Sequence, residues 1–484
     1  MTEQLSRNLI RMMSAVVSFY ICLVSQGLAS APSTPCQDFE ESIKGSAMEC
    51  GTIQVPENHG EPEGKEITIS YVVLKAKNQA STSYPMMYFS GGPGGKTLTG
   101  NSLQQWLKSP IRDERDIILF DQRGIGYSSA LPNMNGEIFE ILAQDVSQEA
   151  EHYLMQNVMV NVQQKIQQQG IHLENYNSFQ NAADAGMIMR HLGYEKYNLY
   201  ATSYGTRLAR VVQDQFPEMI NSVIHNSPSP MTHDFLQARL VGYSLAMERI
   251  FNFCAADKDC RENYPGLKET YFSIFRILKE KPLAVPFGEG VFVINPQDVI
   301  YLLRRASYSS RSRTLVPQLI TALVDEGKGE ALDQIIGFEF MIKDFMNFSM
   351  MLSVERFETF DQAHNSEYIA ASYDKHPLLP VKMGLLDAFY QAGMSWHNGS
   401  VAAEDRIFKI SEVPTLIMSN YFDPATPPEN SHIFKERIPN ALLLILDEGG
   451  HGGGNEKCRN KVMTEFMNKP KDKPDISCLV IYPE

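Results

Sequence analysis

The 484-residue chain lacks several features that would place it in other protein classes. After residue 31 it has no run of about 18 apolar residues, so no later segment is predicted to span a membrane. It has no internal repeat, no low-complexity tract and no long run of like charge, which excludes a solenoid and a charged disordered tail. It also has no Cys-x-x-Cys motif and no cluster of His and Cys, so we expect no metal site and no cofactor.

The chain has fewer basic than acidic residues. Lys and Arg number 43 against 57 Asp and Glu, which gives a formal net charge of −14. An acidic surface repels polyanions, so neither nucleic acid nor anionic lipid is an expected partner. The length allows either several domains or one large α/β domain with an insertion, and the 43% hydrophobic content suffices for a large core.

Residues 1–31 are predicted to be a secretory signal peptide. Arg7 and Arg11 form the positive region, Met12 to Val24 is mostly apolar but short for a membrane span, and Ala29-Ser30-Ala31 is a cleavage site. A membrane anchor is the alternative. We therefore expect a secreted or periplasmic protein without stable membrane association after cleavage, and the oligomeric state is left open.

The cysteines agree with export. Of seven, Cys22 leaves with the signal peptide and six remain. These six fall into three sequence-local pairs, namely Cys36 with Cys50, Cys254 with Cys260, and Cys458 with Cys478. Six cysteines allow many connectivities, but pairing neighbours is the simplest, and reduced thiols in a cytosolic protein are the alternative.

Short apolar runs rich in β-branched or aromatic residues predict buried strands. They are Ile67 to Leu74, Met86 to Phe89, Asp116 to Phe120, Tyr197 to Tyr200, Ser222 to His225, Pro414 to Met418 and Leu442 to Leu446. Helical patterns at Asn181 to Leu192 and Arg207 to Phe216 flank some of these runs. The alternation predicts a mostly parallel sheet with helices on both faces.

Residues 231–400 have a different pattern, with helical spacing as in Leu240 to Phe253 and Leu315 to Glu326 and few strands. We interpret them as a helical cap inserted between two parts of one core, residues 32–230 and 401–484. Such an insertion would lie over the C-terminal edge of the sheet, where active sites form. The alternative is a separate domain that begins near residue 231, although strand patterns return after residue 413.

Ser203 is the candidate nucleophile. The predicted strand that ends at Tyr200 runs directly into Ala201-Thr202-Ser203-Tyr204-Gly205, and a helical pattern follows, as in a nucleophile elbow. The tight turn needs small residues two positions away on each side, and Ala201 and Gly205 meet this need. A single match is a weak signal, and a serine that merely caps an ordinary helix is the alternative.

A glycine-rich loop, Ser90-Gly91-Gly92-Pro93-Gly94-Gly95, follows the predicted strand that ends at Phe89. Such a loop exposes backbone N–H groups, and the oxyanion of an acyl-transfer intermediate needs two N–H donors. We expect these donors to be Gly92 and Tyr204. A phosphate loop is the alternative because Lys96 follows, but the spacing of a phosphate-binding motif is not met.

Asp423 and His451 each follow one of the last two predicted strands, in the chain order Ser, Asp, His that this kind of site uses. His451 would take the proton from Ser203, and Asp423 would orient and stabilise the imidazole. For Asp423 the alternative is a turn residue before proline. Asp447 is a rival acid, only four residues before His451.

Together these motifs resemble the α/β-hydrolase superfamily and, within it, the proline iminopeptidases and secreted tripeptidyl-aminopeptidase-like proteins. The matching segments are Gly91 to Gly95, Asp121 to Ser128, Ser203 to Gly205, Asp423 with Thr426 and Pro427, and Gly450 to Gly452. The resemblance implies an α/β-hydrolase fold with a helical cap. It also implies that Asp121 and Arg123 pair and brace the loops near the oxyanion donors.

The resemblance further implies a serine exopeptidase that removes residues from peptides with a free N-terminus. A buried carboxylate in the cap would bind the substrate amine, with Glu358 as the first candidate and Glu355 as the second. The alternative is that both are solvated helix residues. Whether one residue or three are released is left open.

Two other functions compete with this one. A carboxylesterase would use the same Ser203, Asp423 and His451 but would have an apolar pocket without carboxylates. A non-catalytic binding module of the same fold is disfavoured, because such proteins usually lack one of the three residues and here all three are present.

Overall fold

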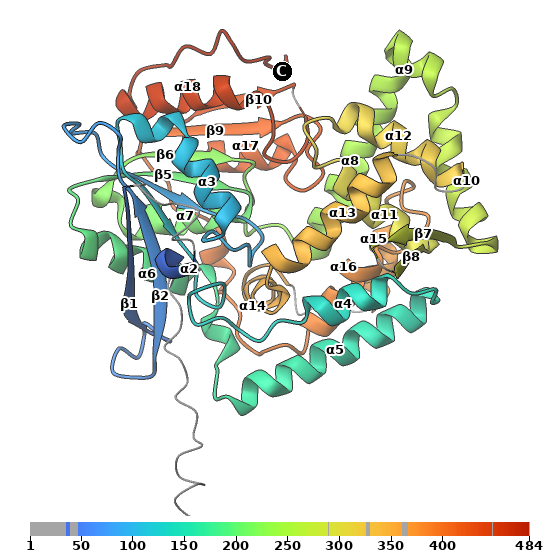
Figure 1. The fold of residues 1–484 in the computed structure, drawn as a ribbon, viewed down its shortest axis with the longest axis horizontal. Helices are drawn as coiled ribbons and strands as arrows, with labels where there is room; N and C mark the ends of the chain where they lie inside the picture. Colours follow the sequence, from blue (N-terminus) through green and yellow to red (C-terminus); the bar gives the residue numbers. More distant parts are fainter. Residues whose placement is uncertain are drawn as a thin grey trace, which may run out of the picture.

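The computed structural model describes residues 35–38, 47–288, 290–325, 330–360, 366–447 and 449–483. The predicted signal peptide and its cleavage site lie outside these residues. An eight-stranded sheet with the order β1-β2-β4-β3-β5-β6-β9-β10 lies in one half of the molecule, on the left in Figure 1. Strand β2 is antiparallel to both its neighbours, and the remaining pairs are parallel. The predicted α/β-hydrolase fold is confirmed.

Most strands of the sheet coincide with buried apolar runs of the sequence. The strands are β1 Met48–Pro56, β2 Glu66–Leu74, β3 Met86–Phe89, β4 Ile117–Phe120, β5 Tyr197–Thr202, β6 Ile220–Asn226, β9 Thr415–Asn420 and β10 Leu442–Leu446. Every residue of β4 and β9 is buried, because helices cover both faces of the sheet. Strand β1 was not predicted, because its partly exposed side chains do not form a continuous apolar run.

The two faces of the sheet have separate hydrophobic cores, and β4 shows the division. Ile118 and Phe120 face the core that contains α6 (Ser178–Leu192) and α7 (Tyr204–Gln215). Ile117 and Leu119 face the core that contains α3 (Gly100–Lys108) and α18 (Glu456–Asn468). The parallel strands therefore end together at one edge of a sheet that is covered on both faces.

A helical body lies beside the sheet and corresponds to the predicted cap (Figure 1). Its helices are α8 Phe235–Ala256, α9 Lys258–Asn263, α10 Leu267–Glu280, α11 Pro296–Ala306, α12 Ser312–Val324, α13 Glu330–Phe345, α14 Phe348–Glu358, α15 Ser366–Asp374 and α16 Gly384–Gly393. It also contains an unpredicted hairpin of β7 (Leu283–Phe287) and β8 (Gly290–Ile294). Helices α4 (Asn135–Leu142) and α5 (Gln148–Gln168) pack against α13 and α16, so a segment before residue 231 also contributes to this body.

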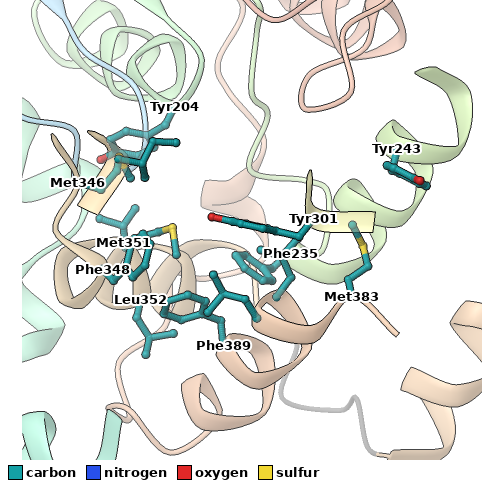
Figure 2. Packing of buried hydrophobic residues seen from close by; sticks show 14 of the residues in the cluster. Tyr204, Phe235, Tyr243, Tyr301, Met346, Phe348, Met351, Leu352, Met383 and Phe389 are labelled. Atoms are coloured by element: carbon teal, nitrogen blue, oxygen red, sulfur yellow. The ribbon is translucent and has the colours of Figure 1, made fainter. Parts of the chain in front are cut away.

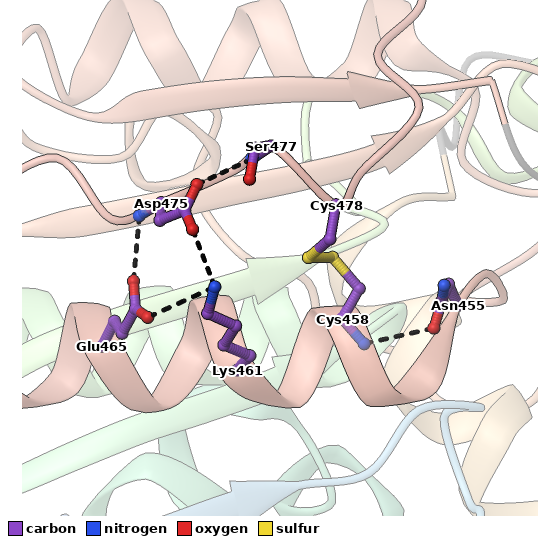
Figure 3. The surroundings of a disulfide bond; sticks show 7 residues. All are labelled: Asn455, Cys458, Lys461, Glu465, Asp475, Ser477 and Cys478. Carbon is purple, nitrogen blue, oxygen red and sulfur yellow. Dashed lines mark hydrogen bonds and ion pairs between the residues drawn. A yellow bond between two sulfur atoms is a disulfide. The ribbon is translucent and has the colours of Figure 1, made fainter.

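Three disulfides join neighbouring cysteines in the sequence. They link Cys36 to Cys50, Cys254 to Cys260, and Cys458 to Cys478. The third ties α18 to the C-terminal tail, where the Lys461 ammonium lies 2.7 Å from the Asp475 carboxylate (Figure 3). Beyond this link, the N–H of Tyr482 donates to the carbonyl oxygen of Ile445, so the tail covers the outer edge of β10.

None of the helices in the described ranges is long and apolar enough to cross a membrane.

Candidate active site

Ser203 lies in the tight turn between β5 and α7. Its backbone has φ 58° and ψ −129°, a conformation that residues with a side chain rarely adopt and that concentrates at functional sites. Gly205 allows α7 to approach the sheet closely, because a Cβ atom there would lie 2.1 Å from the carbonyl oxygen of Phe89. Ala201 pairs directly with Phe89 in the sheet. This is the geometry of a nucleophile elbow.

Asp423 and His451 come together at the ends of β9 and β10. The Nδ1 atom of His451 lies 2.8 Å from one carboxylate oxygen of Asp423 and 3.0 Å from the other. The N–H groups of Ala425 and Thr426 donate to Asp423 at 2.8 and 2.9 Å. Burial alone would raise the pKa of Asp423, but His451 and these hydrogen bonds outweigh burial and lower it below its ordinary value. Asp423 is therefore an ionised partner that can orient the imidazole.

Asp447, the rival acid, has a different partner. Its carboxylate lies 3.5 Å from the guanidinium of Arg313. In the part of the chain that the structure describes, it makes no contact with His451. The geometry therefore favours Asp423 as the acid.

Two cavities adjoin Ser203. The larger has a volume of about 1000 Å³ and is lined by Ser203 and His451 together. Phe348, Met351 and Phe389 form part of its wall, and Tyr301 points toward them from α11 (Figure 2). The smaller cavity, of about 60 Å³, is also lined by Ser203. Among the described residues, no group of His, Cys, Asp and Glu could hold a metal ion.

The two expected oxyanion donors lie beside these cavities. Gly92 lines both of them, and its φ of +124° suits glycine alone. Tyr204 is the first residue of α7 and lines the smaller cavity. The N–H groups of a helix's first turn have no acceptor within the helix, so that of Tyr204 can bind a ligand oxygen.

The predicted pair of Asp121 and Arg123 is wrong. Arg123 instead forms an ion pair with Asp184 at 2.7 Å. Asp121 accepts hydrogen bonds from the N–H groups of Thr97 and Leu98, at 2.7 and 3.0 Å. Asp121 therefore braces the end of the glycine-rich loop directly, without Arg123.

Two cap segments are hydrogen-bonded to the loops that carry Gly92 and His451. The N–H of Asn347 donates to the carbonyl oxygen of Gly94 at 2.8 Å. The N–H of Gly450 donates to the carbonyl oxygen of Ser309 at 2.9 Å. A Cβ atom on Gly450 would lie 1.8 Å from the carbonyl oxygen of Ser307, so only glycine permits this contact. The cap thus fixes the position of both loops.

Glu355 and Glu358, the predicted amine-binding residues, are paired with arginines. Arg207 donates to Glu355 at 3.2 Å and to Glu358 at 3.0 Å, and Arg239 donates to Glu355 at 3.0 Å. Glu358 also accepts from the N–H of Ser178 and lines neither of the two cavities, whereas Glu355 lines the smaller one. Two guanidinium groups occupy the carboxylates that an ammonium would need, which argues against the predicted role.

Arg207 was missed by sequence reasoning. It lies one helical turn after Ser203 on α7, and its guanidinium is buried beside the smaller cavity. No motif marks it, because its partners lie about 150 residues away, at separations of 148 and 151.

We expect Glu355→Gln to lower the free energy of unfolding at pH 7 by about 3 kcal/mol, because it removes the carboxylate that pairs with Arg239 and one of the two that pair with the buried Arg207. Burial alone would raise the pKa of Glu355, but Arg207 and Arg239 outweigh it and lower the pKa from 4.5 to about 2. Because the folded-state pKa is lower than the unfolded one, this stabilisation is complete above about pH 4.5 and disappears as the pH falls toward about 2.

Urea unfolding of both proteins between pH 7 and pH 3 measures this effect. The difference between wild type and Glu355→Gln should shrink on acidification. Glu269→Gln, which changes an exposed residue of α10, is the matched control and should follow the wild type at every pH. A difference that stays constant with pH would contradict the role of the ionised carboxylate.

Comparison of the sequence with known proteins also indicates an α/β-hydrolase. Residues 84–262 match the family described as alpha/beta hydrolase fold, and residues 387–478 match the family described as TAP-like protein. YuaR of Escherichia coli, named as a hydrolase, is 23% identical over 93% of this chain and 92% of its own length. The serine protease Hip1 of Mycobacterium tuberculosis is 24% identical over 48% of this chain and 45% of its own length. The tripeptidyl aminopeptidase of Streptomyces lividans is 25% identical over 37% of this chain and 35% of its own length.

Proposed function

Because the chain is an α/β-hydrolase whose C-terminal part is TAP-like, we propose that it is a serine peptidase with Ser203, His451 and Asp423 as its catalytic residues. The contact of 2.8 Å between His451 Nδ1 and Asp423 is the observation that supports this most strongly. His451 lines the same cavity as Ser203, whose turn is strained. The serine protease and tripeptidyl aminopeptidase names of two relatives agree with the proposal.

The proposed reaction passes through an acyl-enzyme. His451 removes the hydroxyl proton of Ser203 as its oxygen attacks the scissile carbonyl carbon, and the N–H groups of Gly92 and Tyr204 stabilise the resulting oxyanion. The C–N bond then breaks, and His451 gives the proton to the departing amine. A water molecule, deprotonated by His451, attacks the ester carbon; the C–O bond to Ser203 breaks, His451 returns the proton to the Ser203 oxygen, and the N-terminal fragment leaves as its carboxylic acid.

We also propose that the substrate enters by a free N-terminus. The cap covers the catalytic edge of the sheet and leaves a cavity of about 1000 Å³, which suits the end of a peptide better than the middle of a folded chain. Asp344 and Glu456 line this cavity and are the candidate partners of the α-amine, in place of the paired Glu355 and Glu358.

A carboxylesterase is the second candidate. The larger cavity has many apolar wall residues, among them Phe338, Met341, Ile342, Phe348, Met351, Leu385 and Phe389. An ester with an apolar acyl group would fit such a wall and would need no partner for an amine.

The test is a comparison of matched substrates. We expect p-nitroanilides of Ala, Pro and Ala-Ala-Ala with a free amine to be hydrolysed at least about tenfold faster, in kcat/KM, than their N-acetylated forms, because a charge-assisted contact is lost. Equal rates for free and acetylated substrates would contradict the exopeptidase proposal. Short p-nitrophenyl esters cleaved while every anilide is spared would favour the carboxylesterase.

We also propose that the protein is exported from the cytosol. The three disulfides fit an oxidising compartment outside the cytosol. The signal peptide predicted at residues 1–31 would provide the route.

A further inference from the structure

The smaller cavity beside Ser203 carries more positive than negative charge. Arg207, Arg239 and Arg304 line it, and Glu355 is the sole carboxylate among its described lining residues. Glu358 reaches Arg207 from outside the cavity. The cluster thus contains three guanidinium groups and two carboxylates, so one positive charge is not balanced.

The uncompensated group is Arg304. Its side chain comes from α11, is only 6% exposed and lines both cavities. Within the described ranges its guanidinium has no hydrogen-bond or ion-pair partner, its Nε is buried without an acceptor, and its neighbour is the ring of Tyr308 at 5.2 Å. Burying such a cation costs free energy unless an anion joins it, so the arrangement is complete only with a negatively charged ligand.

Arg239 lies beside Arg304 and is held in place. It donates to Glu355 at 3.0 Å and lies over the ring of Phe235 at 3.5 Å. Burial lowers the pKa of Arg239 and the neighbouring charge of Arg304 lowers it further, although Glu355 opposes both. An anion between Arg304 and Arg239 would relieve this repulsion.

The size of the cavity limits what the anion can be. Its volume is about 60 Å³, whereas a water molecule occupies roughly 30 Å³. A carboxylate fits such a space. Guanidinium groups also match a carboxylate in shape, since both are planar and can share two hydrogen bonds.

The larger cavity, like the smaller one, is lined by more positive than negative charge. Its described lining has five cationic side chains, Lys96, Arg239, Arg304, Arg305 and Arg459, against two carboxylates, Asp344 and Glu456. The whole chain, by contrast, has a net charge of −14. A basic cavity in an acidic protein concentrates anions at the site.

We propose that Arg304, together with Arg239, binds a carboxylate of the substrate next to the scissile bond, so that the enzyme prefers substrates with a carboxylate at that position. The carboxylate is either the side chain of the residue whose carbonyl is attacked or the C-terminus of a short departing peptide. This inference rests on the proposed peptidase function.

The experiment measures binding separately from turnover. Isothermal titration calorimetry on the Ser203→Ala protein compares Ala-Ala-Glu p-nitroanilide with its Gln counterpart, and tetra-alanine with its C-terminal amide. The carboxylate-bearing member of one pair should bind roughly ten- to hundredfold more tightly. The pair that responds identifies the source of the carboxylate. Adding Arg304→Gln should abolish that preference, whereas adding Arg276→Gln on the exposed face of α10 should leave it unchanged.

Equal affinities within both pairs would overturn the inference, and this comparison needs no change at Arg304. A preference that survives Arg304→Gln in a folded protein, checked by its melting temperature, would overturn it as well. Parallel kcat/KM measurements on the wild-type enzyme test the proposed function. A carboxylate preference in binding without any hydrolysis would support the anion subsite and contradict the peptidase.

Discussion

Replacing Ser203 by alanine is expected to lower kcat for an aminoacyl p-nitroanilide by roughly 10⁶-fold, to the level left by binding and oxyanion contacts alone. The hydroxyl oxygen is the atom that forms the acyl bond, and no other side chain occupies the strained turn between β5 and α7. The substitution also removes the site of attack on a fluorophosphonate. Covalent labelling should therefore disappear together with turnover.

Ser273→Ala is the matched control for this change. Ser273 lies on α10, lines neither of the two cavities, and among the described residues donates only to the carbonyl oxygen of Thr270 within its own helix. Its variant should keep wild-type turnover and labelling. Labelling that persists in Ser203→Ala, traced by mass spectrometry to another residue, would refute Ser203 as the nucleophile.

Asp423→Asn is expected to lower kcat by roughly 10⁴-fold while the protein stays folded. In the wild type the Asp423 carboxylate faces Nδ1 of His451, which keeps the proton on Nδ1 and leaves Nε2 free to accept the proton of Ser203. The asparagine amide can instead donate an N–H group to Nδ1, which favours the tautomer with its proton on Nε2. That tautomer cannot accept the proton of Ser203. The ionised carboxylate also stabilises the imidazolium formed in the reaction, and a neutral amide does not.

Asp447→Asn separates this effect from a general effect of lost negative charge. Asp447 lies four residues before His451 but is directed to Arg313. Its variant should retain most of the activity. Comparable losses in both variants, measured as kcat at saturating substrate, would contradict the assignment of Asp423 as the orienting acid.

The sheet could be predicted from sequence because its strands are buried on both faces. Ile117–Phe120 is apolar throughout since each face of β4 contacts its own hydrophobic core. The candidate catalytic residues could be predicted for a related reason. Each follows directly from a strand that the apolar pattern locates, and the parallel strands carry them to the same edge of the sheet.

The interior of the cap could not be predicted in the same way. Glu355 and Glu358 have the spacing of solvent-facing helix residues, and only the fold brings Arg207 to them. Arg304 likewise resembles an ordinary helix arginine, although it is buried. Helical periodicity indicates which side chains share a face, but it does not identify the element from another part of the chain that packs on that face.

The hydrogen bonds between the cap and the two loops that carry Gly92 and His451 have a consequence for how substrate enters. A cap that swung away as a rigid lid would pull on Gly94 and Gly450 and would separate the oxyanion donor from the histidine. The site is therefore fully assembled only while the cap is in its closed position. We therefore expect the substrate to reach Ser203 while the cap stays in place, so that the opening of the cavity limits the width and charge of the molecules that enter it.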